Sequence, residues 1–253
     1  MPFALFPSDE AADRALCVGT LGELRRLGSA DALAAWRARP GELFVSPAAA
    51  EASSAAAVAA RLGLKTSVFE TSAMPSPPQP ETLVKAEVTD EGVRLYRKSV
   101  KDFFPYAEFA AFSAGVLEET PPSVNPAGPG SRLKEEIMKT LGEAPPPGTA
   151  PAAPPAKETA FYLDFLTAAG ARFRLRWDEA DYSWLGKKKE YSSMENFRLT
   201  LAELHAFSFG KVPVTAAFAA VRTRAPLAPF RLRDLDALDF NLRWLLAVTR
   251  RAL

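Results

Sequence analysis

The run ARFRLRW at 171–177 constrains the fold more than any other stretch, because polar and apolar residues alternate in it without a break. Successive residues of a β-strand point to opposite faces, so one face is basic and the other is apolar. The run FYLDFL at 161–166 pairs with it across TAAG, where Gly170 permits the turn. We expect an antiparallel hairpin with Asp164 opposite one arginine and with three side chains in a core: Phe173, Leu175 and Trp177.

A helix is predicted shortly after this hairpin, at 192–207. Ser192 and Glu195 have the spacing of a capping box, in which each side chain accepts a hydrogen bond from the other residue's backbone N–H. Apolar residues then recur at spacings of three and four: Met194, Phe197, Leu201 and Leu204. Such a face is typical of a helix that covers a sheet.

The first 71 residues alternate short apolar runs with helix-like, alanine-rich stretches, which predicts three or four strands and two helices. The apolar runs are FALF at 3–6, ALCVGT at 15–20, ELFVS at 42–46 and TSVFE at 66–70, and the helices are expected at 21–38 and 48–62. The order fits a small α+β sandwich of the split βαβ, ferredoxin-like kind. A mini-Rossmann unit competes with it, but no G-x-G-x-x-G motif stands at a strand-to-helix turn.

Residues 72–81 hold four prolines and predict a stiff linker between this domain, 1–71, and a second domain, 82–253. The second domain opens with a hairpin of 83–88 and 93–97, and Val84, Ala86 and Val88 are expected on one of its faces. Short strands are expected at 103–106 and 109–117, with one or two more after Gly210 that are cut by Pro226 and Pro229.

The sequence predicts a terminal helix from about Asp234 with an unusually wide apolar face. Its apolar residues are Leu235, Leu238, Phe240, Leu242, Trp244, Leu245 and Val248. A face this wide must be buried, either on the domain itself or against a partner. Oligomerisation through this helix is therefore possible on the sequence alone.

Residues 118–158 hold ten prolines and are expected to form a flexible insertion between strands. A short helix is expected at its centre, with Leu133, Ile137 and Leu141 one helical repeat apart. Two interpretations stay open. The segment is either a partner-binding helix that folds on contact, or a short helix that frays or rests on its own domain.

The order of elements from 83 to 208 resembles the pleckstrin-homology-like superfold, a bent β-barrel closed at one end by a helix. The runs WDEADYSWLG and SSMENF also resemble a family of bacterial proteins that join a small α/β N-terminal unit to such a domain. The resemblance covers about half of the chain, which departs from the simple superfold by its proline-rich insertion and its segment after the helix. It implies a binding module, although fold alone is a weak argument for function.

Composition excludes several function classes. The formal net charge is +1, from 31 basic and 30 acidic residues, which removes the electrostatic argument for a general nucleic-acid or membrane binder. One cysteine and one histidine cannot form an internal disulfide or the usual zinc sites, so no metal or cofactor is expected and a reducing cytoplasm fits best. No secretion leader or membrane span is predicted, and the alanine and arginine bias is typical of GC-rich bacterial genomes.

No catalytic constellation is predicted. His205 stands on a helix without a nucleophile at a recognisable spacing, and Cys17 lies within an apolar run, where packing explains it. The acidic residues Asp178, Glu179 and Asp181 have the oxygen ligands for a hard cation but lack the ligand spacing of a calcium loop. We therefore expect a protein that is not an enzyme.

Contact chemistry is the better candidate. Arg172, Arg174 and Arg176 form a row on one strand face, and the turn that follows carries Lys187, Lys188 and Lys189. Together they can meet a phosphate-bearing partner; in the simpler interpretation they form a solvated sheet face with the arginines paired to Asp164. Single-stranded nucleic acid is not expected, because the aromatic residues of the strand point to the other face.

These observations favour a non-catalytic binding or scaffold protein that recognises a protein or peptide. The alternative is a phosphate or lipid-headgroup sensor that uses the arginine row and the lysine turn. A third class, a hydrolase or transferase with a carboxylate site near Asp178, predicts a deep cleft around that residue.

Overall fold

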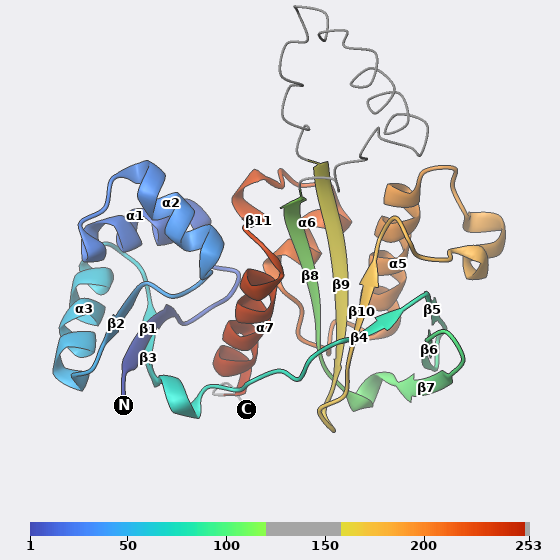
Figure 1. Ribbon diagram of the computed structural model, residues 1–253, viewed down its shortest axis with the longest axis horizontal. Coiled ribbons are helices and arrows are strands. Elements are labelled where there is room, and N and C mark those ends of the chain that lie inside the picture. Colours follow the sequence, from blue (N-terminus) through green and yellow to red (C-terminus); the bar gives the residue numbers. More distant parts are fainter. Residues whose placement is uncertain (120–157, 251–253) are drawn as a thin grey trace, which may run out of the picture. The chain divides into compact units, whose positions relative to one another are not determined.

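The computed structural model describes residues 1–119 and 158–250. The described residues up to Leu117 and from Ala160 onward form one compact unit. The fold is mixed α+β, with a three-stranded sheet near the N-terminus, a five-stranded sheet and a further three-stranded sheet (Figure 1). The predicted insertion helix of Leu133, Ile137 and Leu141 lies outside the described residues and stays a prediction.

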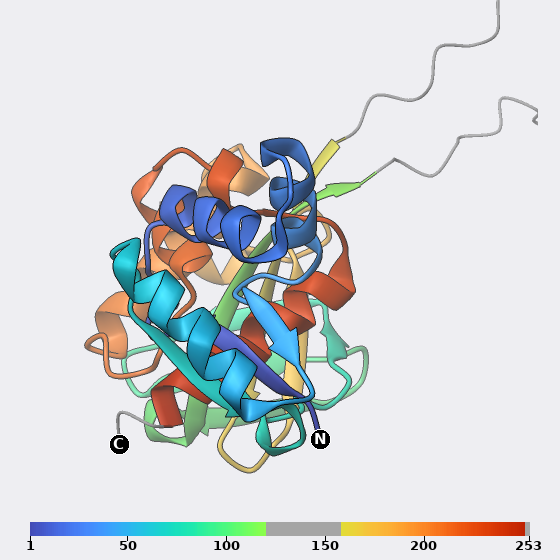
Figure 2. The same ribbon diagram turned by 90° about the vertical axis from the view of Figure 1, so that its left-hand side faces the viewer.

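The N-terminal sheet is antiparallel and has the strand order β2-β1-β3, in which β1 is Phe3–Pro7, β2 is Phe44–Ser46 and β3 is Thr66–Glu70. Three helices accompany it: α1 (Arg14–Arg25), α2 (Ser29–Ala38) and α3 (Ala49–Arg61). In Figure 2, α3 lies in front of the strands, and alanines on its inner face let it approach them closely.

The expected strand at 15–20 is wrong, because these residues belong to α1. Asp13 caps this helix: its carboxylate accepts hydrogen bonds from the backbone N–H groups of Ala15 and Leu16, at 2.8 and 3.1 Å. The buried residues Cys17 and Leu21 then stand four positions apart, as a helix that buries one face requires.

The five-stranded sheet has the order β11-β8-β9-β10-β4. Its strands are β4 (Glu81–Leu83), β8 (Phe109–Glu119), β9 (Glu158–Thr167), β10 (Arg172–Arg176) and β11 (Arg231–Leu232). The hairpin of β9 and β10 is confirmed, with Arg174 directly opposite Asp164. Both faces of this sheet are buried, since every residue of β9 from Phe161 to Thr167 is buried.

The second predicted hairpin is also confirmed. It forms an antiparallel sheet of β5 (Lys85–Val88), β6 (Gly92–Tyr96) and β7 (Lys101–Pro105). Ala86 and Val88 are buried, but Val84 is 41% exposed, because the chain passes from one sheet to the other between Leu83 and Lys85. The strands of the described residues form separate sheets and do not close a barrel.

Helix α5 (Ser193–Phe207) covers one face of the five-stranded sheet, as expected, and buries Phe197, Leu201 and Leu204. The hydroxyl of Ser192 accepts from the Glu195 N–H at 3.5 Å, while the Glu195 carboxylate pairs with Arg198 and Arg224. The strand expected after Gly210 is largely wrong: Ala216–Thr223 forms helix α6, in keeping with its four alanines, and Arg231–Leu232 forms a strand of two residues.

Helix α7 (Leu235–Arg250) packs in two directions. Leu238, Leu242 and Leu245 lie in clusters with the outer face of the five-stranded sheet, whereas Trp244 lies in the core of the N-terminal sheet. The Trp244 indole N–H donates to the Pro7 carbonyl at 3.1 Å. Apart from Leu235, which is 39% exposed, the wide apolar face is therefore packed within the chain, and the prediction that this helix offers it to a second copy has no support here.

Hydrogen bonds from two arginines hold the chain at the residue before the proline-rich linker and within it. Arg243 donates to the Thr71 carbonyl at 2.6 Å, and Arg172 donates to the Pro78 carbonyl at 3.2 Å. Because residues 1–71 share a core with α7, their independent folding stays a prediction. None of the helices within 1–119 and 158–250 combines the length and apolarity of a membrane span.

Candidate functional site

The predicted arginine row does not form an open contact surface. The side chains of Arg172 and Arg174 are 1% and 11% exposed, because α7 covers this face of the sheet. Both pair with Asp164, through Arg172 Nη2–Oδ2 at 2.5 Å and Arg174 Nε–Oδ1 at 2.6 Å, and both reach Asp239 Oδ1 at 2.5 and 2.7 Å. Two guanidinium groups thus balance two carboxylates, as buried charges require.

The remaining basic residues lie apart from this cluster. Arg176 pairs with Asp178 at 2.8 Å, and the three lysines are exposed at the end of the 3₁₀ segment η3 (Ser183–Lys188). Lys188 pairs with Glu203 at 2.6 Å on α5, which covers the sheet face opposite α7. The structure therefore does not bring the predicted arginines and lysines together on one surface.

The candidate catalytic groups also occupy ordinary positions. Cys17 is fully buried, and this burial raises the pKa of its thiol to about 12, so it stays protonated. Burial, and then Arg222, lower the pKa of the half-buried His205. Asp178, Glu179 and Asp181 are exposed, and no three acidic, histidine or cysteine side chains within the described residues are grouped to hold a metal.

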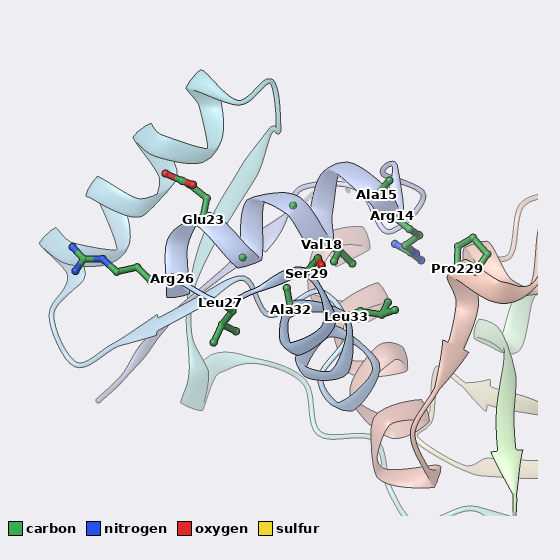
Figure 3. Close-up of a pocket in the computed structure, with 12 residues that line it drawn as sticks. Arg14, Ala15, Val18, Glu23, Arg26, Leu27, Ser29, Ala32, Leu33 and Pro229 are labelled. Atoms are coloured by element: carbon green, nitrogen blue, oxygen red, sulfur yellow. The ribbon is translucent and has the colours of Figure 1, made fainter.

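A groove with a volume of about 840 Å³ lies between α1 and α2. We call it the α1–α2 groove. Figure 3 shows Arg14 and Pro229 at one end, Glu23 and Arg26 at the other, and mainly apolar or small residues between them. The intervening lining is Ala15, Val18, Gly19, Gly22, Leu27, Ser29, Ala32 and Leu33.

Two glycines make the groove. A Cβ added at Gly19 would meet nothing within 4 Å, so the helix surface is open at this point. At Gly22 a Cβ would lie 3.4 Å from the Ala32 Cβ, so this glycine lets α2 approach α1 closely. The turn between the helices is tight: Arg26 adopts a left-handed conformation with φ 55°, and the Leu27 N–H donates to the Gly22 carbonyl at 2.8 Å.

The groove's wall at the Arg14 end is rigid. Arg14 Nη2 lies 2.7 Å from the Glu10 carboxylate, and its guanidinium lies 5.1–5.5 Å from the ring centres of Trp36, Phe230 and Trp244. Its Nη1 has no hydrogen-bond partner among the described residues, and the surrounding rings account for its burial. A fixed wall lowers the conformational entropy that a ligand must remove on binding.

Lining residues occur along α1 from Arg14 to Glu23 and at its C-cap Arg26, so the groove follows one face of this helix over its whole length. At 1.5 Å per residue this face is about 18 Å long, which matches about three turns of a second helix. Leu27 and Leu33, both 36% exposed, add apolar surface beside it. Partly exposed leucines beside glycines allow the apolar face of a second helix to approach closely.

Sequence reasoning missed this groove because it took 15–20 for a strand. The available pattern was Asp13 before a helical repeat, with Gly19 and Gly22 three residues apart on the outer face. Comparison of the chain with models of protein families, with curated proteins and with solved structures found no match.

Proposed function

We propose that this protein is a non-catalytic binding or scaffold protein that holds a helical segment of a protein partner in the α1–α2 groove. The observation that carries the proposal is the groove that follows α1 over its full length and is open at Gly19. Helix-in-groove recognition uses apolar anchors at i, i+3, i+4 and i+7, and a stripe about 18 Å long accommodates them.

We take the N-terminal part as ferredoxin-like and the remainder as pleckstrin-homology-like, within the bacterial family that the sequence resembles. Support comes from α5, which packs on the sheet as the capping helix of that superfold would, and from the order of three strands and three helices in residues 1–71. The single cysteine supports a cytoplasmic protein.

The two competing functions have less support. A phosphate or headgroup sensor needs free basic groups, and Arg172 and Arg174 are buried and paired with carboxylates. A carboxylate enzyme needs an enclosed acid, and Asp178 is exposed and paired with Arg176.

A displayed library of 20-residue helical peptides tests the groove. The full chain is the bait, and bound peptides are measured by titration against Gly19→Leu and Gly19→Ala. Because a side chain at Gly19 meets no other atom, both variants are expected to fold, and only the leucine fills the groove. We expect selected peptides with apolar residues at i, i+3, i+4 and i+7 whose affinity falls about tenfold or more in Gly19→Leu and little in Gly19→Ala.

Circular dichroism and thermal melting of both variants provide the folding control. Peptides that bind Gly19→Leu as tightly as the wild type would place binding elsewhere and contradict the proposal. A library that enriches no helical pattern would also contradict it. A change of oligomeric state with Gly19→Leu would show that a second copy of the chain occupies the groove, which would replace the proposed partner.

A further inference from the structure

A second pocket, of about 330 Å³, lies between the β5–β6 turn, η3 and α5, and nothing in the proposed function uses it. Its floor is apolar, with the buried Leu185, and its walls include the aromatic residues Trp184 and Phe207. Its charged groups are two carboxylates, Asp90 and Glu203, and one ammonium, Lys188. The pocket therefore combines aromatic surface with an excess of negative charge.

Hydrogen bonds fix the frame that carries the two carboxylates. The turn holding Asp90 is closed by Thr89, whose backbone N–H donates to the Gly92 carbonyl at 2.9 Å. Tyr106 secures the same turn by donating its hydroxyl to the Thr89 carbonyl at 2.6 Å. Glu203 projects from α5, a fifteen-residue helix packed on the sheet. The two acids thus come from separate ordered elements and meet at one pocket.

The field at the pocket is negative. Glu203 and Asp90 both line this pocket, and burial and then these two charges raise the pKa of the nearby Tyr106. Lys188 offsets only one of these charges. Its side chain is 65% exposed, and an ion pair this exposed contributes little to stability, so another cation can displace it.

Lys188 also places a cationic group at this pocket. Its ammonium lies 2.6 Å from the Glu203 carboxylate and comes from a segment that also supplies Trp184. A cation beside aromatic rings and a carboxylate gains both charge-assisted hydrogen bonds and attraction to the ring faces. A guanidinium group suits such a pocket better than an ammonium, because it is planar, stacks on aromatic rings and donates five hydrogens.

We propose that this pocket binds the guanidinium end of an arginine-type ligand, with Glu203 and Asp90 as its carboxylate partners and Trp184 and Phe207 as its aromatic walls. The guanidinium can come from an arginine side chain of a protein or from free arginine. Lys188 is then an internal competitor that occupies Glu203 when the pocket holds no ligand.

The test is a titration of the full chain with N-acetyl-argininamide, followed by the NMR signal of the Trp184 indole N–H. N-acetyl-citrullinamide, which has the same shape without the charge, is the matched control. We expect the arginine compound to bind and the citrulline compound to bind much more weakly. No shift with the arginine compound, or equal shifts with both, would overturn the proposal.

Three variants give a second test, because each should change the affinity for the arginine compound in a known direction. Glu203→Gln should weaken binding about fivefold to tenfold, and Trp184→Leu about twofold to fivefold. Lys188→Met should strengthen binding about twofold to fivefold, because it removes the competing ammonium. Weaker binding in Lys188→Met would contradict the proposal, because it would mean that Lys188 does not compete with the guanidinium. Circular dichroism checks that each variant folds, and Gly19→Leu, in the other groove, should leave the affinity unchanged.

The source of the guanidinium is decided by comparing free arginine with N-acetyl-argininamide. Tighter binding of the blocked compound would assign the pocket to an arginine within a polypeptide. Tighter binding of free arginine would assign it to the small molecule. Both results support the guanidinium site and differ only in where its ligand comes from.

Discussion

Trp244→Ala removes the largest side chain that α7 contributes to the N-terminal core. The indole is fully buried, lies 5.8 Å from the Trp36 ring centre at an interplanar angle of 86°, and donates its N–H to the Pro7 carbonyl. Gly41 packs directly on it, in a backbone conformation with φ 87°. Truncation therefore leaves a cavity between the sheet, α2 and α7 that rigid neighbours cannot fill.

The magnitude follows from burial. Trp→Ala substitutions in a core cost about 3–5 kcal/mol, so we expect a loss of about 4 kcal/mol in the free energy of unfolding. Total stabilities are about 5–15 kcal/mol, so this is a large fraction of the whole. For a protein of this size, the melting temperature should fall by about 8–16 °C.

Urea denaturation measures the loss, and hydrogen exchange with mass spectrometry locates it. Amides of β1 and β3 should lose protection, while those of β9 and β10 keep most of theirs, because the second sheet retains its own core. A loss below about 1 kcal/mol would refute the reasoning, since it would mean that residues 1–71 are stable without α7.

Gly41→Ala provides the matched control. A Cβ at this position would overlap the Trp244 indole, and the left-handed φ adds strain of its own. In a double-mutant cycle, Gly41→Ala should cost less free energy of unfolding in the Trp244→Ala background, because the overlap with the indole is gone and only the backbone strain remains. Equal costs of Gly41→Ala in both backgrounds would show that the two residues are not in contact.

Asp164→Asn should lower the free energy of unfolding by about 3–5 kcal/mol, measured with urea, because it leaves Arg172 and Arg174 buried with a single carboxylate; a loss near zero would contradict the buried cluster. Burial raises the pKa of Glu10 above its ordinary 4.5, so its contribution to stability is complete below that value and is lost as the pH rises through the folded pKa. The stability of the wild type relative to Glu10→Gln should therefore fall as the pH rises above about 4.5, and a constant difference would count against this shift. Gly19→Ala should raise the melting temperature, because alanine favours a helix by about 1 kcal/mol over glycine; destabilisation would mean that the helix surface there is not open.

Local patterns predicted the hairpins and α5 because their residues specify their own pairing. In β10 the period of two and the short turn at Gly170 leave one register, so the alternation alone is enough to match Asp164 with an arginine. In α5 the cap at Ser192 marks the start of the helix, and the apolar residues at spacings of three and four mark its buried face. The strand register and the position of the helix each depend on residues that are close together in the chain.

The predictions fail where the burial of a residue depends on segments that are distant in the sequence. The alternation correctly predicts that Arg172 and Arg174 lie on one face of the strand. It does not predict that this face is buried, because Asp239 of α7, which pairs with both arginines, lies more than sixty residues later in the chain. The α1–α2 groove escaped for a related reason. Its shape depends on how two helices meet at Gly22 and Ala32, and a helix pattern records which face is apolar but not what is left uncovered.

The position of Trp244 also orders events during synthesis. The strands and helices of residues 1–71 leave the ribosome before α7 exists, with Phe6 and Leu5 lacking the side chains that complete their core. Roughly 170 further residues must follow, and at about 5–20 residues per second this takes about 10–35 s. During this interval the apolar face of the first sheet is open to chaperones and to other nascent chains. The packing of α7 is thus the step that ends this exposure.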